Sequence, residues 1–282
     1  MKKVALIAFI VFVLGIVGVL TTYASGDHFL TGGNSHDITE SKSFAAENVQ
    51  HLSVKVDVGE VKVKRSNSDE IEVSIRASEQ RKGQIEYSID KKEDVVEVVF
   101  NKDDSPWYSF PNISFGDHGS VVEIKLPDKE FESLAIESDV GEVDVHQVKA
   151  REFTATSDVG DIKVDQVVAD TSTLSSDVGE IEVNGGTGAF HIESDTGDVS
   201  LELNALEEDV HIESSVGEVS VSLINEPKNF TFDLASDVGG VSVEGFSSIQ
   251  KSSGRSYYVE QGNGNSLLQV KADVGEVQVE KN

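Results

Sequence analysis

The fold of this chain follows from the stretch Asp139-Val140-Gly141-Glu142-Val143-Asp144-Val145. Its first four residues return along the chain with small changes, and the glycine is kept in every copy. From Gly141 to Gly239 the successive glycines are 19, 19, 18, 20 and 22 residues apart. Self-similarity at a nearly fixed period indicates stacked supersecondary units. The glycines of these copies are Gly59, Gly141, Gly160, Gly179, Gly197, Gly217, Gly239 and Gly275.

Each copy predicts a strand, a turn and a second strand. Leu134 and Ile136 alternate with polar residues before the turn, as a half-buried strand requires, and the alternation resumes at Val143. Asp suits the first turn position because its carboxylate can bond the backbone two residues on. Val and Gly suit the two central positions of a type II turn, where the glycine has a positive φ. We therefore predict a type II turn at each glycine.

Stacking is expected because one such unit cannot bury its apolar side alone. Units spaced by about 4.8 Å would build a continuous core of like side chains. The sequence thus predicts an all-β, single-chain β-solenoid with rungs of about 19–20 residues. The alternative is an antiparallel meander or sandwich, in which each glycine marks a hairpin. The near-equal period favours the solenoid, since sandwich loops vary more in length.

The composition is strongly acidic. Of 282 residues, 51 are Asp or Glu and 23 are Lys or Arg, which gives a net charge of −28. Such a surface repels nucleic acid and anionic lipid and attracts cations and basic partners. The same charge also keeps a β-rich protein soluble and hinders edge pairing. The chain has no cysteine, which excludes disulfides and thiolate metal sites.

Four regions are expected along the chain. Residues 1–24 carry Lys2 and Lys3 ahead of an apolar run over residues 4–20, whose length suffices to cross a bilayer as a helix. This predicts an N-terminal transmembrane helix in the cell membrane, with the remainder extracytoplasmic. The alternative is a cleaved signal peptide and a secreted protein. Residues 25–47 read as a linker, 48–130 as a β-rich cap or degenerate rungs, and 131–282 as the solenoid repeats.

One loop gathers aromatic residues, including the only tryptophan of the chain. Exposed aromatic side chains make good binding anchors, so this loop is predicted to bind a partner. The alternative is that the rings fold over the open end of the core. The aromatic residues are Trp107, Tyr108, Phe110 and Phe115.

Stacked repeats would also stack their carboxylates. The expected ladders are Asp139, Asp158, Asp177 and Asp195, and Glu142, Asp161, Glu180, Asp198 and Glu218. Like charges so placed repel, and Ca²⁺, which takes oxygen ligands, would relieve this. However, the Asp side chains can instead cap their own turns, and the calcium-binding nonapeptide is absent. We predict no cofactor and no metal site, with Ca²⁺ as the alternative.

Catalysis is not predicted. The carboxylates all occupy equivalent positions in repeated turns, whereas the acid and base of a carbohydrate-active enzyme need different environments. His191 and His211 open matching His-Ile-Glu-Ser phrases and would stack side by side. Such a pair can bind a metal or sense pH, but it equally suits the outer face of a strand.

The repeated Ser/Ala-Asp-Val-Gly-Glu-Val/Ile-x-Val phrase, behind one N-terminal apolar segment, resembles a bacterial family. This is the putative-adhesin family of β-strand repeats, a domain of unknown function, and the resemblance covers roughly residues 40–282. It implies a β-solenoid-like fold and a surface location, and it supplies no catalytic residues. Some members are encoded beside envelope-stress systems of Gram-positive bacteria.

These observations predict a non-catalytic, extracytoplasmic protein of the cell surface. It would act as an adhesin or as a scaffold that contacts envelope proteins or polymers, because the extended faces of solenoids commonly bind partners. An accessory or sensory part of a cell-envelope stress response is the alternative function. A carbohydrate-active enzyme is a third and less favoured reading.

Overall fold

The computed structural model describes residues 36–79, 85–102, 119–249 and 252–282. Apart from the short 3₁₀ helix η1 (Ala46–Asn48), the regular elements in these ranges are strands, which confirms the all-β prediction. No helix in these ranges has the length and apolar character needed to span a membrane. Residues 35–282 form one compact unit. The predicted transmembrane helix and the aromatic loop lie outside the described residues.

The strands follow one another with short connections. In chain order they are β1 (His36–Ala45), β2 (His51–Val58), β3 (Glu60–Arg65), β4 (Glu70–Glu79), β5 (Ile85–Lys92), β6 (Val95–Lys102), β7 (Val121–Leu126), β8 (Glu130–Val140), β9 (Val143–His146), β10 (Lys149–Val159), β11 (Ile162–Val178), β12 (Ile181–Thr196), β13 (Val199–Leu203), β14 (Val210–Val216), β15 (Val219–Leu223), β16 (Phe230–Val238), β17 (Val241–Glu244), β18 (Ser252–Gly254), β19 (Ser256–Gln261), β20 (Ser266–Val274) and β21 (Val277–Lys281).

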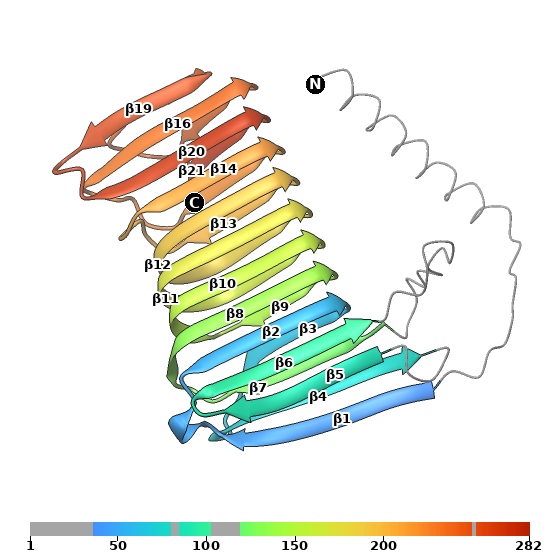
Figure 1. Cartoon of the computed structure of the whole chain (residues 1–282). Coiled ribbons are helices and arrows are strands. Elements are labelled where there is room, and N and C mark those ends of the chain that lie inside the picture. Colours follow the sequence, from blue (N-terminus) through green and yellow to red (C-terminus); the bar gives the residue numbers. More distant parts are fainter. Residues whose placement is uncertain (1–35, 80–84, 103–118, 250–251) are drawn as a thin grey trace, which may run out of the picture. The chain divides into compact units, whose positions relative to one another are not determined.

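Successive repeats pair in parallel and in register (Figure 1). β8, β10 and β11 lie side by side, with Val159 of β10 opposite Val140 and Val178. On the other side of the glycine corner, β9 pairs with the start of β11, so that Ile162 lies opposite Val143. Each repeat is thus a strand, a glycine corner and a second strand, and we call this unit a rung. The parallel register excludes the antiparallel sandwich for the repeats.

The rungs do not stack in chain order at either end. The rung β2–β3 lies between β8–β9 on one side and β6–β7 on the other. At the opposite end, the last rung of the sequence, β20–β21, lies between β14–β15 and β16–β17. The first and the last rung of the sequence therefore lie inside the stack, where the rungs on both sides pair with their backbone groups.

Antiparallel strands cover both ends of the stack. β5 pairs with β6, while β4 joins β7 to β1. At the other end β19 pairs with β16, and β18 pairs with β17. Region 48–130 thus contains both rungs and cap strands, and β1 lies within the segment expected as a linker. Such covers protect a parallel edge from pairing with other chains.

The core lies between the two strands of each rung, where inward side chains pile into columns. Ile136, Ala155, Leu174 and Ile192 lie in register and are buried. Opposite them on the second strands, Val145, Val164, Val183 and Leu201 do the same. Each rung alone would expose these side chains, so the apolar surface that drives folding is buried only by stacking.

Candidate functional site

The glycine corner is hydrogen-bonded between rungs. The Gly160 N–H donates to the carbonyl oxygen of Val178 at 2.8 Å, and the Ile162 N–H donates to that of Glu180 at 2.8 Å. Gly160 has a φ of 152°, far from the value of about +80° at the third residue of a type II turn. The predicted type II turn is therefore wrong. The backbone hydrogen bonds between neighbouring rungs continue through the corner and keep its backbone extended.

Close approach of the backbones explains why the corner residue is glycine. A Cβ on Gly160 would lie 2.0 Å from the carbonyl oxygen of Gly141, and one on Gly179 would lie 2.1 Å from that of Gly160. No side chain fits at such distances. The structure places all eight predicted glycines in one file, in the order Gly59, Gly141, Gly160, Gly179, Gly197, Gly217, Gly275 and Gly239.

A row of exposed apolar side chains runs beside this file. The residue before each glycine points outward, and the exposed fraction is 38% for Val140, 48% for Val159 and 62% for Val238. Strand register places them next to one another, rung after rung. We call this row the valine ridge: Val58, Val140, Val159, Val178, Thr196, Val216, Val274 and Val238. The sequence prediction treated these valines only as turn residues.

Acidic residues flank the valine ridge on both sides. The first acidic file precedes the ridge in each rung, and the second follows the glycine. The first file is Asp57, Asp139, Asp158, Asp177, Asp195, Asp273 and Asp237, with Ser215 in place of one acid. The second is Glu60, Glu142, Asp161, Glu180, Asp198, Glu218 and Glu276. We call the ridge and both files the corner band.

The carboxylates of the corner band repel one another. Partial burial, together with the charges of Asp57 and Asp158, raises the pKa of Asp139. In the second file, Lys163 pairs with Glu142 at 2.8 Å and Lys62 pairs with Glu60 at 2.6 Å. From Asp158 to Glu218, no acid of either file forms an ion pair with a Lys, Arg or His of the described chain. The acids in the middle of the band therefore form no ion pair with the residues described, although the charge of Lys163 acts on Asp161.

Some of these acids also hold the stack together. The Glu180 N–H donates to a carboxylate oxygen of Asp161 at 3.0 Å, and the Glu218 N–H donates to one of Asp198 at 2.8 Å. These acids thus bond the next rung, not their own turn. Within the described ranges, no group of three or more His, Asp or Glu is arranged to hold a metal ion.

His191 and His211 lie side by side on neighbouring strands, as the matching phrases indicate. Their ring centroids are 6.4 Å apart and the ring planes make an angle of 62°. A ring nitrogen of His191 lies 3.0 Å from Glu193, and one of His211 lies 3.3 Å from Gln269. Each ring therefore bonds a neighbouring side chain on the outer face of the sheet.

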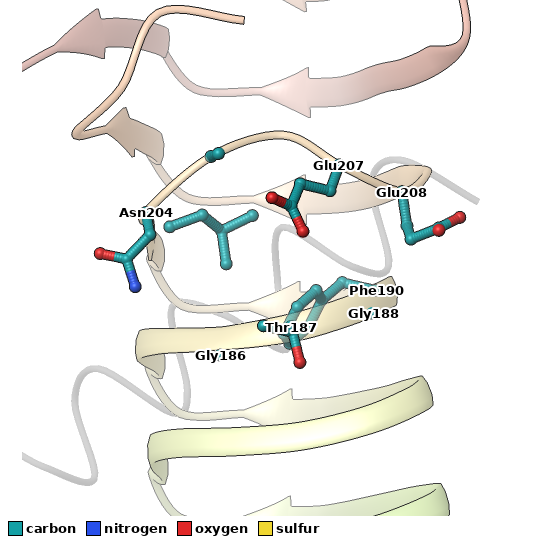
Figure 2. Close-up of a pocket in the computed structure, with 9 residues that line it drawn as sticks. Gly186, Thr187, Gly188, Phe190, Asn204, Glu207 and Glu208 are labelled. Carbon is teal, nitrogen blue, oxygen red and sulfur yellow. The ribbon is translucent and has the colours of Figure 1, made fainter.

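A small cavity lies where the chain passes from one rung to the next, away from the glycine file. Its volume is about 60 Å³, and Gly186, Gly188 and Phe190 of β12 line it together with the loop after β13. Figure 2 shows Glu207 on that loop above Phe190. Small-molecule sites enclose about 300–1,000 Å³, so this cavity has room only for a few water molecules.

A larger, open hollow of about 530 Å³ lies near η1, and paired charges line it. Arg65 and Lys149 both contact Asp128, at 2.9 and 2.7 Å. The Lys129 ammonium donates to the carbonyl oxygens of Ala46 and Val49, and burial is the main cause that lowers its pKa. Because these charges satisfy one another, the hollow offers less to a ligand than the corner band.

A buried serine column lies just inside the corner and was not foreseen. Six of the eight repeats place a serine directly before the first acidic file, while Val56 and Ala272 hold this position in the other two. These serines are almost fully buried: Ser138, Ser157, Ser176, Ser194, Ser214 and Ser236. The Ser236 hydroxyl donates to the Gly275 carbonyl oxygen at 2.7 Å. The repeated Ser-Asp-Val-Gly phrase was the available signal, because a small hydroxyl fits under a closely packed glycine corner.

Parallel rungs with a repeated corner define an all-β repeat protein. The chain belongs to the Toastrack DUF4097 family, whose profile matches residues 131–280. No curated protein matches the chain.

Solved structures similar to this chain include proteins of three bacterial species. A putative cell adhesion protein of Clostridium sporogenes is 19% identical over 88% of this chain and 100% of its own, with a TM-score of 0.42. A putative adhesin of Bacteroides fragilis is 14% identical over 86% and 97%, with a TM-score of 0.44. A putative adhesin of Parabacteroides distasonis is 13% identical over 89% and 98%, with a TM-score of 0.37.

Proposed function

We propose that this protein is a non-catalytic, extracytoplasmic scaffold of the cell surface that binds envelope partners along its corner band. The observation that carries the proposal is the valine ridge. Exposed valines repeat on rung after rung between two acidic files, and contiguous exposed apolar rows mark interaction sites. The predicted anchor in residues 1–24 would hold the scaffold at the membrane.

The architecture that we infer for the binding part is a β-solenoid with rungs of about 19–20 residues. The parallel register between neighbouring repeats and the single file of corner glycines support this inference. A stack of this kind presents a long surface on which weak contacts repeat, and extended solenoid faces commonly bind partners.

The proposal is tested by capture from envelope fractions. The full-length protein would be compared with a variant carrying Val159→Ser, Val178→Ser and Val216→Ser. We expect the parent to retain specific envelope proteins or wall polymers that the variant does not retain. A matched control is Val168→Ser, since Val168 is 45% exposed but lies outside the ridge. Equal capture by the parent and the triple variant would contradict a role for the corner band.

Localisation needs its own measurement. Membrane partition and N-terminal sequencing of the mature protein, together with protease accessibility in intact cells, would test the anchor and the side on which the scaffold lies. If the protein in intact cells is protected from added protease, the extracytoplasmic proposal is contradicted.

A further inference from the structure

The corner band has a pattern that specifies the chemistry of its partner. We propose that the corner band binds a basic amphipathic α-helix of a partner protein, lying along the stack axis with its apolar stripe on the valine ridge. This inference rests on the proposed function and identifies the kind of segment that the scaffold recognises.

Charge selects a basic partner. The chain has a net charge of −28, and both files beside the ridge are acidic. A second copy of the same band or an anionic lipid surface would bring like charges together. A helix with an apolar stripe and Lys or Arg on both sides of it matches the order acid, valine, acid across the band.

Spacing selects a helix over an extended strand. Neighbouring rungs are about 4.8 Å apart, so the eight ridge residues span about 34 Å. A helix returns a side chain to the same face every 5.4 Å or so, which stays close to the rung spacing over several turns. An extended strand does so only every 6.7 Å or so and loses register sooner. A helix of about 22 residues would cover the whole ridge.

The middle of the band is the expected centre of the contact. Val159, Val178 and Val216 are each 43% exposed or more. Their acidic neighbours from Asp158 to Glu218 form no ion pair with the described residues. At the N-terminal end of the band, Lys62 and Lys163 already pair with acids of the second file, which leaves less charge for a partner.

The test uses a designed, dye-labelled peptide of about 22 residues, the length that spans the ridge as a helix. It carries Leu at heptad positions a and d and Lys at e and g. The full-length protein in nanodiscs of zwitterionic lipid is titrated with it by fluorescence anisotropy, and empty nanodiscs give the background. Controls are a peptide of the same composition with its Leu and Lys scrambled, and a peptide with Glu in place of Lys.

We expect the Lys peptide to bind at least tenfold more tightly than either control, and the affinity to fall as salt rises. The triple Val→Ser variant should weaken binding at least tenfold, and Val168→Ser should change it less than twofold. Equal binding of the scrambled peptide, or equal loss in the two variants, would overturn the proposal. A dimer in light scattering that the triple variant abolishes would do the same, because a second copy would then occupy the ridge.

The two levels of inference fail differently. If the triple variant loses envelope capture but no helical peptide binds, the scaffold function stands and the helix proposal falls. If the peptide binds in the expected way but envelope capture does not depend on the ridge, the ridge binds basic helices and the envelope-scaffold function falls.

Discussion

Gly275 packs directly on Gly217, since a Cβ placed on Gly275 would come within 1.7 Å of the Gly217 carbonyl oxygen. Gly239 packs on the other side of Gly275, where its Cβ would lie 1.9 Å from the Gly275 carbonyl oxygen. The last repeat of the sequence is therefore an inner rung. Along the sequence, the outer rung β16–β17 and the cap strands β18 and β19 come before this rung. The chain then returns, and β20–β21 lies between β14–β15 and β16–β17.

Close packing along the glycine file predicts a large loss of stability on Gly160→Ala. The added Cβ would overlap the Gly141 carbonyl, so two rungs must separate, and we expect a loss of about 2–4 kcal/mol in the free energy of unfolding. Urea denaturation measures it. Gly119→Ala is the matched control, because no heavy atom lies within 4 Å of its added Cβ. Similar losses in both variants would show that the glycine file does not hold the rungs close.

Buried serines predict effects of opposite sign. Ser172 is fully buried between Phe153 and Phe190, and its hydroxyl has no partner, so Ser172→Ala should stabilise the protein by about 1 kcal/mol. Ser236→Ala removes the bond to the Gly275 carbonyl and should destabilise it by about the same amount. Thermal unfolding distinguishes the two. A loss in both variants would mean that the Ser172 hydroxyl is satisfied.

The hairpin between β5 and β6 offers a stabilising change. Glu93 has a φ of 54°, a conformation that costs a non-glycine residue about 1 kcal/mol, and it is the first residue of a two-residue loop. Glu93→Gly should therefore raise the melting temperature. Asp94→Gly, at the neighbouring position without a positive φ, should lower it because the unfolded chain gains freedom. The opposite order would contradict this turn geometry.

Asp139→Asn should stabilise the protein at neutral pH. Folding raises the pKa of Asp139, so the folded state holds this proton more tightly than the unfolded chain does. That contribution favours folding below the ordinary pKa of 3.8 and is lost as the pH rises through the folded value, which leaves the ionised carboxylate unfavourable at pH 7. The gain should vanish in acid and shrink in high salt. Urea midpoints at several pH values test this, and a gain that grows in acid would contradict it.

The sequence was sufficient for part of this architecture. Alternation around Leu134, Ile136 and Val143 predicts the strands, and the spacing of the glycines predicts which residues stack. Stacking order at the ends was beyond reach, because the copy at Gly275 has the same pattern as its neighbours and nothing local says which one it contacts. The turn residues at Gly160 led to the wrong prediction of a type II turn. Glycine is required there because neighbouring rungs come into close contact.

The proposed binding surface could not be predicted from the sequence pattern either. Valine is usually buried in strands, so Val159 and Val178 were not read as exposed. Only the parallel register turns these scattered residues into one ridge between two acidic files. The serine column was missed for a similar reason, since a serine before an aspartate reads as turn composition until the neighbouring rung is known.

The stacking order of the corner is tested most directly by engineered disulfides, since the chain has no cysteine of its own. Neighbouring rungs about 4.8 Å apart allow a disulfide, whereas rungs two steps apart do not. The pair Asp237→Cys with Asp273→Cys should cross-link under mild oxidation, and so should Ser215→Cys with Asp273→Cys. The pair Ser215→Cys with Asp237→Cys should stay reduced. Efficient cross-linking of that last pair, with none between Ser215→Cys and Asp273→Cys, would mean that the rungs stack in chain order and would contradict the corner described here.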